Sequence, residues 1–168
     1  EGRGANYAMK ALEALTTVRA YNLRSLLPEC LVRQANSIAR KDPIEGRKLL
    51  DEAEMVIGED VIIKLWLYLN RAEMEHLEGN LNKAEEELRK WEELANDRED
   101  VDRQSYHHLR FRTQATRGNY PVALKHLTKA LSIAKLKKKW INVAWILQEK
   151  AEFHAQTGDL KRAAIDAE

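Results

Sequence analysis

The chain has 168 residues, of which 44% are hydrophobic and 33% are charged, and its formal net charge at pH 7 is +1. This length suits one domain or one short array of repeats. A single cysteine excludes an internal disulfide framework, and the lack of any run of about 18 apolar residues excludes a membrane span, so we expect no membrane partner.

Helical periodicity begins near the N-terminus. Apolar residues recur at intervals of four and three from Ala8 onward, which indicates one helix face over residues 5–22. A first helical hairpin is predicted over residues 26–57, where Asp42-Pro43 is a typical helix start. These two segments therefore predict half a repeat followed by a complete one.

Three further hairpins, predicted over residues 60–96, 101–136 and 140–168, share a turn signal. Each has a glycine, then Asn or Asp, then a bulky residue, and an alanine five places after the glycine. The copies, spaced 39 and 40 residues apart, are Gly79-Asn80-Leu81 with Ala84, Gly118-Asn119-Tyr120 with Ala123, and Gly158-Asp159-Leu160 with Ala163. A fixed period of this size indicates a stack of similar helical units.

The residues of these turns have physical roles. Glycine readily adopts the left-handed conformation that ends a helix. Asn119 is placed to act as the N-cap of the next helix, and Pro121 falls in that helix's first turn, where its missing N–H is not needed. The alanine after each turn, and Gly46 in the first hairpin, allow two antiparallel helices to approach closely. Each hairpin is then stabilised by stacking on its neighbours.

The period and the turn signal resemble the tetratricopeptide repeat (TPR) superfamily over nearly the whole chain. The repeats are longer than the family's usual 34 residues, and the glycine of its Trp-x-x-Leu-Gly opening is replaced by Ala72, Phe111 and Ala151. This divergence is similar to that of the sensor arm of MalT-like bacterial transcription regulators. The resemblance implies an all-α, right-handed α-α superhelix, a TPR-like solenoid of about four helical hairpins plus one N-terminal helix, in a single domain over residues 1–168.

Catalytic motifs are scarce in this sequence. Histidines lie at positions 76, 107, 108, 126 and 154, and the neighbours His107 and His108 point about 100° apart on a helix, so they cannot grip one metal ion. We expect exposed or half-buried helix histidines instead. The glycines are isolated turn residues rather than a phosphate loop, and Cys30 is expected to be a small core residue. We therefore expect no enzymatic activity, no cofactor and no metal.

The tryptophans differ in their expected roles. Trp66 and Trp145 each lie 13 residues before a turn glycine, at equivalent places in their repeats. In TPR-like stacks this place faces the concave groove, where an aromatic side chain can anchor a ligand; alternatively, the two residues seal one hairpin against the next. Trp91 is expected to pack internally. The groove candidates are Trp66, Glu73, His76, His108, Arg112, Trp145, Gln148 and Glu152.

Charge is distributed unevenly along the chain. Between Glu45 and Asp102 there are 18 acids and eight bases, whereas residues 103–148 contain ten bases and no acid. Because opposite potentials steer encounter, the favoured partner is an acidic or neutral protein or peptide, with head-to-tail self-association second. Nucleic acid is the least favoured partner, since no base-reading motif is present. The expected basic patch includes Arg110, Arg117, Lys125, Lys129, Lys137, Lys138 and Lys139.

The favoured function is a non-catalytic binding or scaffold module that docks a protein or peptide partner in the concave groove. The alternative is an effector-sensing and oligomerisation domain of a larger bacterial transcription or signalling regulator. The first residues carry no secretory signal pattern, which favours a cytoplasmic location. Because the chain lacks an initial Met and ends within an Ala-rich amphipathic stretch, we expect it to be a piece of a longer protein.

Overall fold

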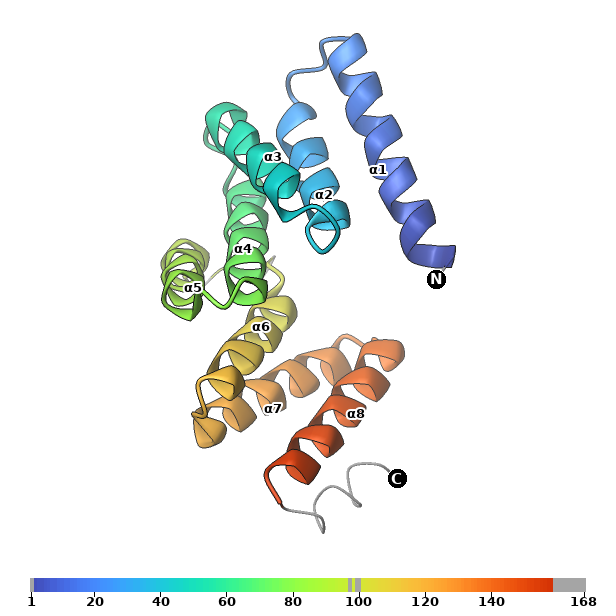
Figure 1. The fold of residues 1–168 in the computed structure, drawn as a ribbon. Coiled ribbons are helices and arrows are strands. Elements are labelled where there is room, and N and C mark those ends of the chain that lie inside the picture. The colour runs from blue at the N-terminus through green and yellow to red at the C-terminus, as the bar shows by residue number, and fades with distance from the viewer. Residues whose placement is uncertain (1, 97, 99–100, 159–168) are drawn as a thin grey trace. The chain divides into compact units, whose positions relative to one another are not determined.

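The computed structural model describes residues 2–96, 98 and 101–158. Within these residues the chain is all-α, with eight helices and no strand, which confirms the predicted fold class. The superhelical arrangement and the number of repeats stay predictions. The helices are α1 (Gly2–Ala20), α2 (Leu27–Ile38), α3 (Pro43–Val56), α4 (Val61–Leu77), α5 (Leu81–Ala95), α6 (Arg103–Thr116), α7 (Tyr120–Leu136) and α8 (Trp140–Gln156) (Figure 1).

The chain divides into two compact units. Unit 1, Glu1–Val101, contains α1 to α5, and unit 2, Asp102–Glu168, contains α6 to α8. In unit 1, α2 packs against α1, α3 and α4, and α4 packs against α3 and α5; in unit 2, α7 packs against α6 and α8. The pairs α2–α3, α4–α5 and α6–α7 are therefore helical hairpins, and the second helix predicted for the last hairpin lies outside the described residues. A single domain over residues 1–168 stays a prediction.

The glycine turns of two hairpins have the same geometry. Gly79 and Gly118 both have a φ of +79°, in the left-handed region. After Gly79, the N–H of Asn80 donates to the carbonyl of Glu75 at 2.8 Å, and the turn after Gly118 repeats this bond at 2.9 Å. These bonds close the preceding helices in the manner of a Schellman motif, which requires a residue that tolerates positive φ.

The asparagine after each of these glycines binds back to the preceding helix. Asn119 occupies the N-cap position of α7, but its side chain makes no capping bond, so that part of the prediction is wrong. Its Nδ2 instead donates to Oε1 of Gln114 at 2.9 Å, and Nδ2 of Asn80 donates to Oε2 of Glu75 at 3.0 Å. Gln114 and Glu75 are buried, and buried polar groups need a hydrogen-bonding partner. The same side-chain hydrogen bond therefore stabilises both turns. Pro121 lies in the first turn of α7, as predicted.

The core of unit 1 is apolar and is formed mainly by α2, α3 and α4. Leu31 and Leu50 are almost completely buried there, and Cys30 is half-buried against the same cluster. Gly46 lies where α3 approaches α4: a Cβ added to it would meet Cε of Met74 at 3.4 Å. The small residue predicted at this place therefore permits close packing of the helices.

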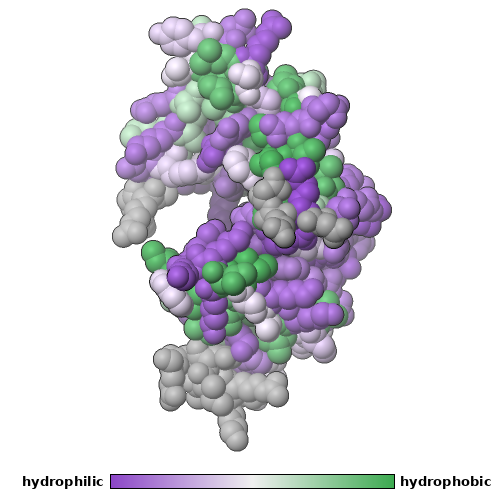
Figure 2. Space-filling view, turned by 180° about the vertical axis from the view of Figure 1, so that it is seen from behind, coloured by the Kyte–Doolittle hydropathy of each residue, from purple (hydrophilic) through white to green (hydrophobic). Residues whose placement is uncertain are grey.

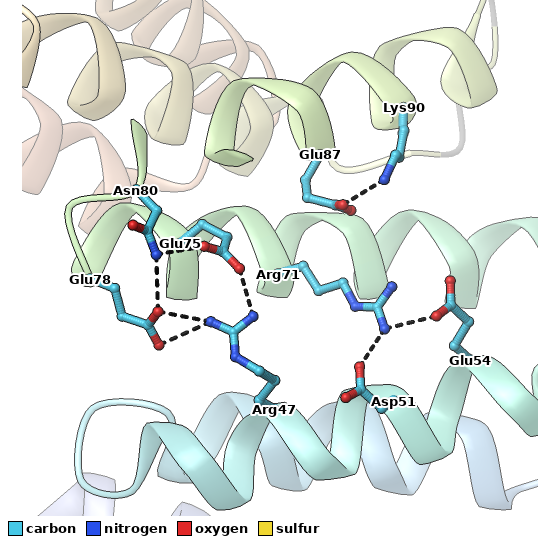
Figure 3. A network of polar contacts seen from close by, with 9 residues as sticks. All are labelled: Arg47, Asp51, Glu54, Arg71, Glu75, Glu78, Asn80, Glu87 and Lys90. Carbon is cyan, nitrogen blue, oxygen red and sulfur yellow. Dashed lines mark hydrogen bonds and ion pairs between the residues drawn. The ribbon is translucent and has the colours of Figure 1, made fainter. Parts of the chain in front are cut away.

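Two arginines join α3 to α4 through ion pairs (Figure 3). Arg47 on α3 donates to Oε1 of Glu75 on α4 at 2.6 Å. The remaining bonds, from 2.7 to 3.0 Å, join Arg47 to Glu78 and Arg71 to Asp51 and Glu54. The buried apolar contact between α3 and α4 is thus flanked by charged hydrogen bonds on the outside.

The core of unit 2 lies among α6, α7 and α8. Phe111 on α6 and Phe153 on α8 meet edge to face, with ring centroids 5.4 Å apart. The inner side of α7 contributes fully buried residues at helical spacing, namely Ala123, Leu127, Ala130 and Ala134. This stripe fills the space between α6 and α8, so the three helices form one packed cluster.

The residues that the repeat pattern assigned to packing are buried. Ala84 on α5 and Ala123 on α7 have no exposed surface, whereas the corresponding Ala163 lies outside the described residues. Trp91 on α5 is 1% exposed, which confirms its predicted packing role. Outside the cores, the view in Figure 2 shows a mainly hydrophilic surface with separate groups of hydrophobic residues.

Candidate functional site

The eight groove candidates form two separate groups. The first group belongs to α4 of unit 1, and the second belongs to α6 and α8 of unit 2. The two groups differ in exposure: Trp66 and Glu73 in the first group contact other residues of unit 1, whereas the second group contains the exposed ring of Trp145. The members are Trp66, Glu73 and His76 on α4, His108 and Arg112 on α6, and Trp145, Gln148 and Glu152 on α8.

Contacts within unit 1 occupy the α4 group. The guanidinium of Arg33 on α2 lies over the ring of Trp66, 5.0 Å from its centroid, and Trp66 also packs against the core of unit 1. Glu73 forms an ion pair with Arg40 at 3.4 Å. His76 is half-buried. These contacts favour the role in which Trp66 seals α4 against α2, rather than the role of a ligand anchor.

The second group contains a direct contact between α6 and α8. The rings of His108 and Trp145 have centroids 4.5 Å apart and are inclined by 51°. Nε2 of His108 also lies 2.6 Å from Oε2 of Glu149 on α8. Trp145 nevertheless remains 51% exposed. His108 therefore holds the indole from one side while about half of it stays available to a partner.

Helix geometry explains why these side chains share one surface. His108 and Arg112 are one turn apart on α6, and Trp145, Glu149 and Glu152 recur at intervals of four and three on α8, so each set lies on one helix face. Nε2 of Gln148 donates to Oε1 of Glu152 at 2.9 Å. We call the following residues the α6–α8 surface: His108, Arg112, Trp145, Gln148, Glu149 and Glu152.

The α6–α8 surface belongs to the basic unit of the chain. Residues 1–101 contain 21 acids and 15 bases, a formal charge of −6, and residues 102–168 contain six acids and 13 bases, a formal charge of +7. The change of sign along the sequence thus coincides with the boundary between the two units. Glu149 is the first acid after residues 103–148, and it is the one that binds His108.

The predicted basic patch is spread over several parts of unit 2. Arg110 on α6 is half-buried, and its Nε donates to the hydroxyl of Tyr106 at 3.0 Å. Its guanidinium lies 5.5 Å from the centroid of the same ring. Arg117 is exposed at the end of α6. The exposed lysines are Lys125 and Lys129, one turn apart on α7, and Lys137, Lys138 and Lys139 between α7 and α8.

A second histidine contact joins α6 to α7. Nδ1 of His107 and Nδ1 of His126 lie 3.1 Å apart, so one ring donates and the other accepts. The neighbours His107 and His108 therefore diverge as predicted, one toward α7 and the other toward α8. Within the described part of the chain, no group of three or more His, Cys, Asp or Glu side chains is arranged to hold a metal ion.

Two of these contacts escaped the sequence patterns. His126 lies 19 residues from His107, and Glu149 lies 41 residues from His108. Neither pair has a spacing within one helix from which its contact could be predicted. For Glu149 a usable signal existed: it follows Trp145 by one helical turn and therefore shares its face. For His126 we find no comparable signal in the sequence.

Searches of protein families, of curated proteins and of solved structures find no significant match to this chain. None of the described helices is long and apolar enough to cross a membrane. The α6–α8 surface presents an indole, an imidazole, a guanidinium and carboxylates. Such a combination can bind a protein segment through one apolar contact and several directed hydrogen bonds.

Proposed function

We propose that this chain is a TPR-like helical-repeat module that docks a protein or peptide partner on the α6–α8 surface. The observation that carries the proposal is the contact between His108 and the half-exposed Trp145. A few aromatic residues supply much of the binding energy in many interfaces, because they bury a large area with few rotatable bonds. Since His108 already restrains Trp145, binding costs less side-chain entropy than it would for a mobile indole.

The packing of the helices supports the repeat architecture in this proposal. In unit 1, α2 packs against α3 and α4, and α3 packs against α4, so each of these helices contacts its next neighbours. In unit 2, α6 reaches α8 through His108 and Trp145. Stacked hairpins have this pattern, in which the first helix of one repeat meets the first helix of the next. Partner-binding side chains on α6 and α8, the first helices within unit 2, then share one surface.

The charge of unit 2 supports an acidic or neutral partner. Arg112 belongs to the α6–α8 surface, and the exposed Lys125 and Lys129 on α7 make no ion pair with any described residue. Positive potential raises the rate of encounter with carboxylates more than it raises the final affinity. An apolar side chain of the partner is expected on Trp145, with acidic groups directed toward the lysines of α7 rather than toward Glu149 and Glu152.

Affinity capture tests the proposal. The 168-residue chain is immobilised, exposed to a lysate of the organism that encodes it, and the retained proteins are identified by mass spectrometry. Trp145→Ala is compared with Trp140→Ala, which removes another exposed tryptophan of α8 that lies outside the α6–α8 surface. We expect a protein that the unmodified chain and Trp140→Ala retain and Trp145→Ala loses.

Salt separates the electrostatic part of the proposal from the apolar part. Raising the salt from about 50 to about 500 mM takes screening between exposed charges from weak to strong. We expect less capture at the higher concentration. Equal retention by all three forms, or no specific retention by the unmodified chain at the lower concentration, contradicts docking through Trp145.

A further inference from the structure

The connection between α7 and α8 is an exposed corner of unusual composition. We call residues 135–141 the basic corner. It contains four lysines and three large apolar residues, and Leu136, Trp140 and Ile141 are 83%, 65% and 85% exposed. The four lysines are exposed and make no ion pair with any described residue. Apolar side chains that stay in water contribute no burial free energy to folding, so the packing of unit 2 does not explain why this corner contains three of them.

Lys138 has a backbone conformation that suits glycine. Its φ is +52°, in the left-handed region. At the corresponding corner, between α3 and α4, that place is held by Gly58 with a φ of +57°. A residue with a Cβ is strained in this conformation, whereas glycine is not. Lysine at this position therefore lowers the stability of the corner relative to glycine.

Lys139 carries a charge that does not suit its position at the start of a helix. The helices α4 and α6 begin with Asp60 and Asp102, whose carboxylates accept hydrogen bonds from N–H groups in the first turn. Lys139 is the N-cap of α8 and makes no side-chain capping bond. Its positive charge also lies at the positive end of the helix dipole. Lysine thus occupies two adjacent positions, 138 and 139, at which another residue type would be more stable. Such choices are expected where a surface has a function.

The corner between α3 and α4 carries the opposite charge and also contains a residue with positive φ, Gly58. We call residues 54–60 the acidic corner. It contains three acids and no base, and its apolar residues Met55 and Val56 are exposed, the former by 79%. Glu59 is fully exposed and lies 3.5 Å from Lys64. Both corners thus combine charge with exposed apolar side chains, and the sign of the charge is reversed between them.

We propose that the basic corner of one copy of this chain binds the acidic corner of a second copy. Lysine ammonium groups meet carboxylates, and Met55 packs against the apolar residues of the basic corner. The two surfaces are different, so the contact is heterologous and extends head to tail into filaments or closed rings. This inference uses residues outside the α6–α8 surface and goes beyond the proposed docking function.

A second copy is the favoured occupant because the chain itself supplies both halves of the contact. An anionic membrane or an unrelated acidic protein would account for the basic corner but would leave the exposed Met55 of the acidic corner without a role. The formal charges of the units, −6 for residues 1–101 and +7 for residues 102–168, are nearly equal and opposite. Contact between unlike units of two copies therefore cancels most of the charge and steers their encounter.

Sedimentation velocity of the 168-residue chain tests this inference. In about 50 mM salt, we expect the sedimentation coefficient to rise with protein concentration up to about 500 µM, and to return toward the monomer value in about 500 mM salt. Lys137→Glu with Lys139→Glu removes the net positive charge of the basic corner and leaves the acidic corner intact, and Met55→Lys with Glu59→Lys removes the net negative charge of the acidic corner and leaves the basic corner intact. We expect each double variant to associate at least about tenfold more weakly than the unmodified chain. An equimolar mixture of the two is expected to associate again.

A third variant separates association from folding. Lys138→Gly with Lys139→Asp places a glycine at the left-handed position and an aspartate at the N-cap, the residue types that the α3–α4 corner has at Gly58 and Asp60. We expect this variant to unfold at a higher temperature and yet to self-associate more weakly, so unfolding cannot explain the loss. Trp145→Ala is expected to self-associate like the unmodified chain, which keeps this test independent of the docking proposal.

Three results would overturn the inference. The first is an unmodified chain that stays monomeric at about 500 µM in low salt. The second is a mixture of the two double variants that fails to associate. The third is an unmodified chain that sediments with anionic phospholipid vesicles, or binds a polyglutamate peptide, without associating with itself.

Discussion

The ring of His108 on α6 lies against the ring of Trp145 on α8, with centroids 4.5 Å apart, and the same imidazole is 2.6 Å from a carboxylate oxygen of Glu149. This arrangement fixes the exposed indole in one orientation. It also joins two helices whose contact is otherwise formed through α7 and the Phe111–Phe153 pair. The docking proposal depends on this relationship, so its strength is the first quantity to measure.

A double-mutant cycle measures the coupling between the two rings. We expect the free energies of unfolding of His108→Ala, Trp145→Ala and the double variant to be non-additive by about 0.5–1.5 kcal/mol, the usual coupling of packed aromatic rings. Chemical denaturation at pH 7 provides the values. Additivity within about 0.3 kcal/mol would mean that His108 does not restrain Trp145.

The Arg47–Glu75 contact predicts a dependence of stability on pH. Burial alone would raise the pKa of Glu75, but hydrogen bonds from Arg47 and Asn80 outweigh it and hold the pKa below its ordinary value of 4.5. A carboxyl with a lower pKa in the folded state contributes stability above its unfolded pKa and loses it as the pH falls through the folded pKa. We therefore expect Glu75→Gln to cost about 1–3 kcal/mol at pH 7 and progressively less below pH 4.5.

The matched control for this prediction is the exposed pair Arg89–Glu93. Exposed ion pairs contribute little, so Glu93→Gln should change the free energy of unfolding by less than about 0.5 kcal/mol at either pH. Urea denaturation at pH 7 and at pH 3.5 supplies the comparison. An effect of Glu75→Gln that is equal at both pH values would contradict a role for the ionised carboxylate.

Trp91 predicts a large loss of stability in unit 1. The side chain is 1% exposed, and its removal leaves a cavity among α5 and its neighbours. We expect Trp91→Ala to lower the free energy of unfolding by about 3–5 kcal/mol. Trp140→Ala, which truncates a tryptophan that is mostly exposed, should change it by less than about 0.5 kcal/mol. Thermal unfolding of both variants tests this prediction. Similar midpoints for the two variants would contradict the burial of Trp91.

The left-handed turn positions predict substitutions of opposite effect. Gly118 has a φ of +79°, and no atom lies within 4 Å of a Cβ added there, so Gly118→Ala meets backbone strain alone and should cost about 1–2 kcal/mol. Lys138→Gly relieves such strain at a φ of +52°, whereas the greater conformational freedom of glycine in the unfolded chain opposes this gain. We expect the free energy of unfolding to rise by about 1 kcal/mol. Differential scanning calorimetry should show midpoints displaced in opposite directions. A lower midpoint for Lys138→Gly would contradict the conformation assigned to the corner.

The helices were predictable because their ends are marked in the sequence. Gly79 and Gly118 end helices, Pro43 and Pro121 lie in the first turns of helices, and the repeated interval between the turns sets the helix lengths. The buried polar partners of the turns were not predictable in the same way. Glu75 could be recognised as buried only once α3 had brought Arg47 beside it, because a lone carboxylate in a helix is usually solvated.

The candidate site was predictable only as separate halves. Helical spacing placed His108 with Arg112, and the repeat register gave Trp145 and Trp66 equivalent places. The exposure of each indole depends on the side chain that the neighbouring helix brings against it. Arg33 of α2 covers Trp66, which packs against the core of unit 1, whereas Trp145 beside His108 remains 51% exposed. That outcome follows from the rotation and register of two packed helices, which a local pattern does not contain.

The most direct test of the docking proposal is hydrogen–deuterium exchange of the chain with and without the protein recovered by affinity capture. We predict slower exchange on binding within residues 103–116 and 140–156, which form α6 and α8, and no such change in Trp145→Ala mixed with the same protein. Slower exchange confined to residues 2–56, with α6 and α8 unaffected, would contradict the assignment of the docking surface.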